Sequence, residues 1–276
     1  MKKITRRSFL AAAGLTAAAL ALTACGGSSS STASSVASSA AASSEAASSS
    51  AAASELTTVE AGKLTMATNA AFPPYEMTTD AGDFEGIDIE TAQAIADKLG
   101  LELQIDDMDF DAALLSVQQG KADIVMAGVT VTDERKAVMD FSDSYATGIQ
   151  SIIVPEGSDI ATPDDLAGKK IGTQRGTTGY IYCSDDFGDE NVVAYDDGLT
   201  AVQALNNGQV DAVVIDNAPA KEFIAANPGL VILETSYAEE DYAIGLAKGS
   251  SLEDAINSAL EELKADGTLQ SIVDKY

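Results

Sequence analysis

Arginine is rare in this chain after its first 25 residues, where only Arg135 and Arg175 occur among 43 aspartates and glutamates. Arg135 follows an apolar, strand-like run in the segment MAGVTVTDERKAVMDFS, residues 126–142. A guanidinium group presents two parallel N–H donors in a rigid fork, whereas lysine offers a strongly hydrated point charge. Arg135 is therefore the first candidate for binding a carboxylate.

Two stretches 88 residues apart share one pattern, and it places an acidic residue in a matching position. LLSVQQGKADIVM (114–126) and VQALNNGQVDAVV (202–214) each join an amphipathic helix end to a glycine, an aspartate and an apolar strand. The pattern fits two lobes of like topology, although two unrelated αβ units could also share it. With two lobes, Gly128 and Asp216 follow equivalent strands, where open α/β sheets bind ligands.

Composition excludes several classes of function. Lys2, Lys3, Arg6 and Arg7 are set apart at the N-terminus, so the rest of the chain has 12 basic against 43 acidic residues, a formal charge of −31. Such a charge argues against nucleic acid or anionic lipid as a partner surface. The chain has no histidine, and its two cysteines are Cys25 and Cys183. Imidazole-dependent triads and ordinary zinc sites are excluded, and we expect no metal or cofactor.

The N-terminus has the features of an export signal. Residues 1–24 combine a basic start with an apolar core too short for a good membrane span. LTAC, ending at Cys25, resembles the lipobox of bacterial lipoproteins, which predicts lipidation of Cys25. TRRSFL (5–10) resembles a twin-arginine signal, but a plain basic start fits as well. Residues 25–58 are rich in serine and alanine and predict a flexible tether.

The remainder alternates strand-like and helical segments. Residues 63–68 and 101–106 have strand character, and residues 88–99 carry apolar positions at helical spacing. This alternation predicts an α/β fold.

Several stretches of the chain resemble extracellular solute-binding proteins of family 3, the polar amino acid receptors of ABC importers. The resembling stretches cover nearly the whole mature part in order: ATNAAFPPYEM (67–77), FEGIDIETAQAIADKLG (84–100), GKADIVMAGVTVTDERKAVMDFSDSY (120–145), GKKIGTQRGTTG (168–179), VDAVVIDN (210–217) and ALEELKADGTLQSIVDKY (259–276).

The resemblance implies the type II periplasmic-binding-protein-like fold, with two α/β lobes, two crossing hinge strands and a ligand cleft between the lobes. The crossings are expected near residues 146–151 and 236–243. The first lobe then comprises residues 59–148 plus 242–276, and the second residues 149–241.

The resemblance also assigns ligand-binding roles. Arg135 matches the arginine that binds the ligand carboxylate, although it could instead pair with Asp133 or Glu134. Asp216 matches the aspartate that binds the ligand ammonium, although aspartate after a strand often caps a helix.

Further positions complete the implied site. Thr130, the backbone at Gly128 and Thr178 match hydrogen-bonding positions, although polar relatives often carry serine in place of Gly128. Phe72 and Phe110 match aromatic walls around the ligand side chain, and each could instead be a core residue.

Asn69 occupies a position that is often acidic in relatives binding basic amino acids. Its neutral amide favours a polar ligand such as glutamine or cystine, whereas Arg175, if it reached the cleft, would favour an acidic one.

The implied function is a monomeric binding lipoprotein without enzymatic activity. It would be anchored on the extracytoplasmic face and deliver an amino acid to a membrane permease. Two alternatives stay open. One is an enzyme on the same fold, such as a dehydratase using Glu76 or Glu85 as a general acid. The other is a tethered sensor module.

Overall fold

The computed structural model describes residues 56–276. The predicted signal peptide, Cys25 and nearly all of the predicted tether lie outside the described residues. Among residues 56–276, no helix has the length and apolar character that crossing a bilayer would require.

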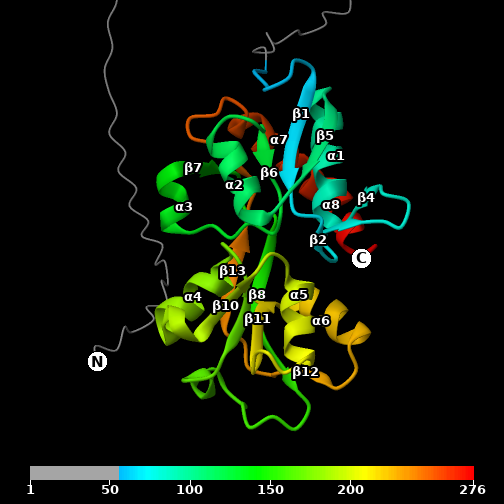
Figure 1. Ribbon diagram of the computed structural model, residues 1–276. Coiled ribbons are helices and arrows are strands. Elements are labelled where there is room, and N and C mark those ends of the chain that lie inside the picture. The colour runs from blue at the N-terminus through cyan, green and yellow to red at the C-terminus, as the bar shows by residue number, and fades with distance from the viewer. Residues whose placement is uncertain (1–55) are drawn as a thin grey trace, which may run out of the picture. The chain divides into compact units, whose positions relative to one another are not determined.

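The first lobe is built around a five-stranded sheet in the order β5-β1-β6-β14-β7 (Figure 1). Strands β1, β5 and β6 run parallel, and β14 is antiparallel to β6 and β7. The strands are β1 (Lys63–Thr68), β5 (Glu102–Asp107), β6 (Ile124–Val125), β7 (Met139–Phe141) and β14 (Gly245–Ala247). A small sheet of β2 (Ala71–Phe72), β3 (Glu76–Thr78) and β4 (Phe84–Glu85) joins it.

The helices of the first lobe come from both ends of the described chain. They are α1 (Ile87–Leu99), α2 (Phe110–Gln118), α3 (Asp133–Val138), α7 (Glu253–Ala265) and α8 (Thr268–Val273). Helix α7 packs against α1, so the C-terminal segment returns to the lobe in which the described chain starts.

The second lobe has a sheet in the order β10-β9-β11-β8-β12, with β13 paired to β8. Its strands are β8 (Ala146–Pro155), β9 (Ile171–Gln174), β10 (Val192–Tyr195), β11 (Ala212–Asp216), β12 (Leu230–Ile232) and β13 (Ala238–Tyr242). Its helices are α4 (Thr178–Phe187), α5 (Gly198–Asn206), α6 (Asn217–Ala226) and the 3₁₀ turns η1 (Pro163–Leu166) and η2 (Asp189–Asn191).

The two lobes repeat one topology, as the internal sequence similarity predicted. In the first lobe β1 lies between β5 and β6, and in the second β9 lies between β10 and β11. The next strand in each sheet, β14 or β8, is antiparallel to its neighbour. The order β10-β9-β11-β8-β12 therefore corresponds to β5-β1-β6-β14-β7. Gly120 and Gly208, the shared glycines, both have positive φ, 65° and 68°. The repeat therefore reflects structure and not a chance resemblance of composition.

Strands β8 and β13 carry the chain between the lobes. They pair antiparallel, from Ala238 opposite Gln150 to Tyr242 opposite Ala146. This pair lies where the two crossings were predicted, and in Figure 1 both strands lead from one lobe into the other. The residue limits proposed for the lobes stay a prediction.

Helix α1 illustrates how sequence pattern sets an element. Its buried positions include Ile89, Ala92 and Ala96, spaced by three and four residues, so one face packs into the core. Gly100 ends the helix in the left-handed conformation, with φ 69°. The predicted helix, residues 88–99, agrees with the observed one within one residue.

Gly86, between β4 and α1, allows no side chain. Its φ is 128°, and a Cβ atom would lie 2.2 Å from the carbonyl oxygen of Tyr75. We expect Gly86→Ala to lower the free energy of unfolding by at least about 2 kcal/mol, since strain and a backbone clash add. Gly82→Ala is the control, because Gly82 has φ 88° but open space around it. Equal urea midpoints for the two variants would show that the clash is relieved.

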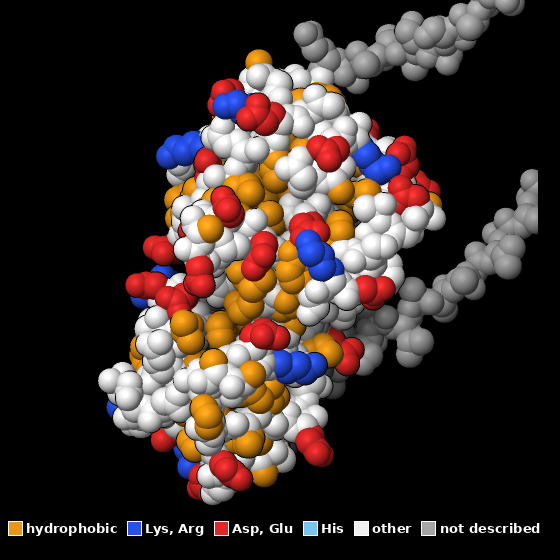
Figure 2. All heavy atoms as spheres, turned by 90° about the vertical axis from the view of Figure 1, so that its right-hand side faces the viewer, with side chains coloured by type: hydrophobic (Ala, Val, Ile, Leu, Met, Phe, Trp, Pro, Cys, Tyr) orange, Lys and Arg blue, Asp and Glu red, His pale blue; other side chains and the backbone are white. Residues whose placement is uncertain are grey.

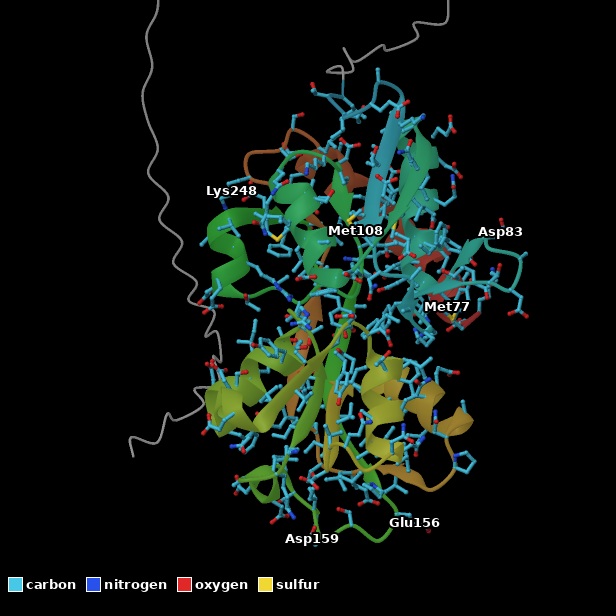
Figure 3. The ribbon with its side chains drawn as sticks, in the orientation of Figure 1. Met77, Asp83, Met108, Glu156, Asp159 and Lys248 are labelled. Atoms are coloured by element: carbon cyan, nitrogen blue, oxygen red, sulfur yellow. The ribbon has the colours of Figure 1, made fainter. Side chains whose placement is uncertain are left out.

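The molecular surface agrees with the acidic composition. In Figure 2 acidic side chains are spread over both lobes on the face shown. Figure 3 places Glu156 and Asp159 at the end of the second lobe away from the first, and Met77 and Asp83 on the small sheet and its turn.

Candidate functional site

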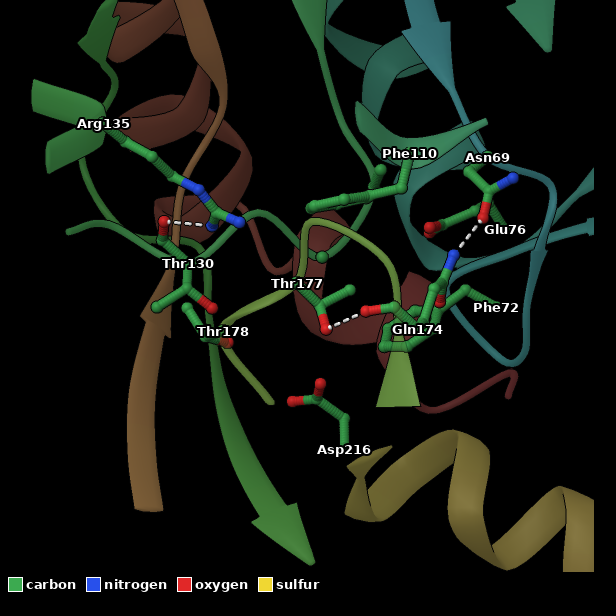
Figure 4. A pocket seen from close by; sticks show the side chains of 12 residues that line it. Asn69, Phe72, Glu76, Phe110, Thr130, Arg135, Gln174, Thr177, Thr178 and Asp216 are labelled. Carbon is green, nitrogen blue, oxygen red and sulfur yellow. Dashed lines mark hydrogen bonds between the residues drawn. The ribbon is translucent and has the colours of Figure 1, made fainter. Parts of the chain in front are cut away.

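A cavity lies between the lobes and is lined by residues of both. Figure 4 shows its side chains. All eight residues predicted to bind ligand line it: Asn69, Phe72, Phe110, Gly128, Thr130 and Arg135 from the first lobe, and Thr178 and Asp216 from the second. Glu76, Ala127, Gln174 and Thr177 complete the lining. The fold thus brings the predicted residues together, and their ligand contacts remain a proposal.

Arg135 lies in the first turn of α3, where Thr132 caps the helix by accepting a hydrogen bond from the Arg135 backbone N–H. Its side chain is buried, and the guanidinium group lies 5.4 Å from the centroid of the Phe110 ring. Nη1 donates to the carbonyl of Thr130 at 2.7 Å. Nη2 donates at 3.2 Å to the carbonyl of Gly176, in the second lobe.

No carboxylate within the described part of the chain forms an ion pair with Arg135. The alternative pairing with Asp133 or Glu134 is therefore wrong for this structure. Burial lowers the pKa of Arg135, and the negative charges of Glu240 and Asp216 act in the opposite direction. A guanidinium has five N–H donors, so Arg135 retains donors for an anion in the cavity.

Asp216 is the last residue of β11 and the first flanking residue of α6, but its side chain does not cap that helix. It accepts a hydrogen bond from Gln150 Nε2 at 2.7 Å and another from the Tyr242 hydroxyl. Burial, reinforced by the charge of Glu240, raises the pKa of Asp216 to about 7, although the bonds from Tyr242 and Gln150 oppose that rise. The carboxylate is thus costly to ionise without a cationic partner.

Gly128 holds the first-lobe loop close to the aromatic wall. It has φ 54°, and a Cβ atom would lie 2.9 Å from the ring of Phe72. A serine, which polar relatives often carry here, would therefore need Phe72 to move. The N–H of Gly128 donates to Asp88 at 3.0 Å, and Asp88 also accepts from the Tyr145 hydroxyl. Sequence reasoning missed this support by Asp88.

Thr178 opens helix α4 directly after the capping residue Thr177. The first backbone N–H groups of a helix have no partner within it, and they favour anions. The hydroxyl groups of Thr178 and Thr130 both donate to Glu240, so the donors that these residues can offer to an anion are their backbone N–H groups.

Phe72 and Phe110 line the cavity and also belong to hydrophobic clusters. Phe72 stacks on Tyr75 with ring centroids 5.9 Å apart. Each phenylalanine therefore packs in a hydrophobic cluster and also forms part of the cavity wall.

The amide of Asn69 forms part of a contact between the lobes. It donates to the carbonyl of Met108 at 2.9 Å, and its oxygen accepts from Gln174 Nε2 at 2.8 Å. Gln174 was not predicted, although it ends a buried strand at the edge where ligands bind in α/β sheets. That position is the signal that could have identified it.

Glu76 is fully buried in the cavity wall. Neither of its carboxylate oxygens has a hydrogen-bond donor in the described part of the chain. Burial, the nearby charge of Asp88 and a hydrogen bond that the protonated Glu76 can donate to Asp88 raise the pKa of Glu76 well above its usual value. Glu85, the other candidate acid, is exposed and does not line the cavity.

Arg175 lies outside the cavity. Its side chain is half exposed, 3.5 Å from the carboxylate of Asp196. It therefore gives no support to an acidic ligand. Within residues 56–276 no group of three or more potential metal ligands is present.

The sequence model of the bacterial extracellular solute-binding proteins, family 3, matches residues 64–276. The chain belongs to this family. It is 33% identical over 222 residues to the L-cystine-binding protein TcyJ of Escherichia coli K12, covering 79% of this chain and 83% of that protein. It is 32% identical over 224 residues to the arginine-binding extracellular protein ArtP of Bacillus subtilis, covering 78% and 86%.

Solved structures of similar amino-acid-binding proteins share the fold. The arginine-, lysine-, histidine-binding protein ArtJ of Geobacillus stearothermophilus matches with a TM-score of 0.74 and 34% identity, covering 78% of this chain and 94% of that one. An ancestral arginine-binding protein bound to glutamine matches with a TM-score of 0.74 and 42% identity, covering 78% and 97%. The predicted fold class and family are confirmed.

Proposed function

We propose that this chain captures an amino acid between its lobes and delivers it to the permease of an ABC importer. One observation carries the proposal: Arg135 of the first lobe and Asp216 of the second line the same cavity. A guanidinium and a carboxylate are complementary to the carboxylate and ammonium of a zwitterion. The ligand would favour lobe closure, because only closed lobes let both residues bind it.

For the ligand, the neutral amide of Asn69 supports a polar side chain such as that of glutamine or cystine. The buried carboxyl of Glu76, which no donor reaches and which lies beside Asp88, supports a side chain with a positive group, because a cation would balance the negative charge of the two neighbouring carboxyl groups. Cystine carries a second ammonium, which Glu76 could bind, and a second carboxylate, for which the cavity wall offers the amide of Asn69. A basic amino acid is the second candidate, and Glu76 is the observation in its favour.

A calorimetric screen of the purified protein against the twenty amino acids and cystine tests the function and ranks the ligands. Binding of cystine or a basic amino acid is the expected result. Selective binding of glutamine would contradict the proposed role of Glu76, and binding of no amino acid would contradict the function. Turnover of a prephenate-like acid would support the enzymatic alternative instead.

Glu76→Gln separates charge recognition from shape. If the ligand is cationic at its far end, we expect the substitution to weaken its binding by about tenfold or more, since a charge-assisted bond is lost. Binding of glutamine, if measurable, should change little. Glu85→Gln is the matched control, because Glu85 is exposed on neighbouring β4. Equal affinities for the cationic ligand in the wild type and Glu76→Gln would contradict this role.

Ligand binding should depend on pH through Asp216. The pKa of this carboxyl is about 7 in the ligand-free protein. Below that pH, binding an ammonium must displace this proton, so for a ligand without a second cationic group affinity should fall by about tenfold per pH unit as pH decreases from 7 to 5. Calorimetry across this range tests the slope. The Asp216→Asn variant should lose most of the dependence, and an unchanged slope in that variant would assign the proton to another group.

Anchoring on the extracytoplasmic face is part of the proposal. Its support is the lipobox-like sequence ending at Cys25, together with membership of an extracellular family. Mass spectrometry of the mature N-terminus is expected to show an acylated Cys25. In cells expressing Cys25→Ser, the protein should no longer be found in the membrane fraction. Its presence in that fraction would contradict the lipid anchor.

A further inference from the structure

Glu240 is a buried carboxylate on crossing strand β13, and it is only 6% exposed. Its Oε2 atom accepts three hydrogen bonds: from Thr130 Oγ1 at 3.1 Å, from Thr178 Oγ1 at 3.0 Å and from Gln150 Nε2 at 3.0 Å. Its Oε1 atom has no donor at ordinary hydrogen-bond geometry in the described part of the chain, although the Tyr182 hydroxyl of α4 lies nearby, where burial and the charge of Glu240 raise the pKa of Tyr182. Glu240 does not line the cavity, so these contacts are separate from the proposed ligand contacts.

The three donors come from different parts of the fold. Thr130 belongs to the first lobe, and Thr178 begins helix α4 of the second. Gln150 lies on β8, the other crossing strand, and pairs with Ala238 of β13. A single oxygen therefore joins both lobes to the crossing strands.

We propose that Glu240 is a positioning residue that holds the lobes closed, by gathering the hydroxyl groups of Thr130 and Thr178 on one carboxylate oxygen. The inference rests on the proposed capture by lobe closure and adds a residue that stabilises the closed form together with the Arg135–Gly176 and Asn69–Gln174 hydrogen bonds. Because the two threonines belong to different lobes, opening must break at least one of the two bonds. Charge-assisted bonds of this kind are strong enough to shift a closure equilibrium.

The same group is connected to both proposed ligand partners. Thr130 accepts a hydrogen bond from Arg135 through its carbonyl at 2.7 Å. Gln150 uses one amide nitrogen for Glu240 and for Asp216, the latter at 2.7 Å. Closure through Glu240 therefore sets the positions of the cationic and the anionic partner at once.

The test measures closure directly in the full chain. Spin labels are attached at Lys136→Cys on α3 and Asp185→Cys on α4, two exposed sites on opposite lobes, in a Cys25→Ser background. Cys183 is buried and should not be labelled. Double electron–electron resonance then gives the distance distribution with and without a mixture of the twenty amino acids and cystine.

We expect Glu240→Ala to reduce the ratio of closed to open molecules by about tenfold and Glu240→Gln to reduce it less, because glutamine retains an acceptor oxygen. Glu239→Gln is the control, since Glu239 is the exposed neighbour on the same strand and carries the same charge. Distributions that match for the wild type, Glu239→Gln and both Glu240 variants would overturn the proposal.

A double-mutant cycle distinguishes closure from general damage. The effect of Glu240→Gln should shrink in a Thr130→Val or Thr178→Val background and return in Thr130→Ser, which keeps the hydroxyl. Effects that simply add in both valine backgrounds would overturn the proposed link. If the mixture fails to shift the wild-type distribution, the proposed function fails, whereas the ligand-free distributions still decide the role of Glu240.

Discussion

Arg135→Ala is expected to abolish high-affinity ligand binding, with a loss of about 3 to 5 kcal/mol, or roughly two to four orders of magnitude in Kd. The ligand carboxylate would be buried in the closed cavity without its cationic partner, so the cost includes an uncompensated buried charge. Arg135→Lys should recover only part of the affinity, because lysine keeps the charge and loses the planar fork. Calorimetry with the ligand selected by the screen measures both effects.

Lys136→Ala is the matched control for Arg135→Ala. Lys136 follows on the same short helix, but its side chain is exposed. Thermal melting without ligand should show that Arg135→Ala still folds, although the bonds to Thr130 and Gly176 are lost. If Arg135→Ala and the wild type bind the ligand equally, the carboxylate assignment is wrong.

Asp216→Asn is expected to have opposite effects on binding and on stability. Asparagine keeps one acceptor oxygen in place of the two that Tyr242 and Gln150 use, and it cannot balance an ammonium, so ligand affinity should fall by about 3 to 5 kcal/mol. The ligand-free protein should gain stability at pH 8. The folded-state pKa of about 7 lies above the ordinary value of 3.8, so Asp216 contributes most stability below about pH 4 and loses it as pH rises toward 7.

Urea unfolding at pH 8, with and without ligand, tests both the expected gain in ligand-free stability and the expected loss of ligand affinity. Asp241→Asn is the control, because Asp241 is an exposed aspartate on β13 that does not line the cavity. A lower ligand-free stability of Asp216→Asn than of Asp241→Asn would contradict the view that the buried carboxylate is destabilising. Undiminished ligand affinity would contradict its role as the ammonium partner.

The fold could be predicted largely from local patterns. Helix α1 has apolar residues at helical spacing and a glycine at its end, and both features are local consequences of backbone geometry. The repeated segment before Gly128 and Asp216 gave the common topology of the lobes, because similar αβ units place equivalent residues at the same sheet edge. The match to family motifs identified the cavity-lining residues, which patterns alone do not distinguish from core residues.

Other features depend on contacts between distant segments. Glu76 resembles many exposed glutamates in sequence, and only the packing around β3 makes it a buried carboxyl without a donor. The alternatives for Arg135 and Asp216 could be decided only by the geometry, which shows neither the local ion pair nor the helix cap. Local sequence contains the competing partners but not the distances to them.

By itself, the sequence determined the charge, the absence of imidazole chemistry, the alternation of elements and the residues that could bind a zwitterion. Only the tertiary structure decided that Gln174 meets Asn69 and that Glu240 joins Thr130 to Thr178. These partners are 62 to 110 residues apart along the chain. Their hydrogen bonds form only when two separately patterned lobes are brought face to face, so no local rule of spacing could have predicted them.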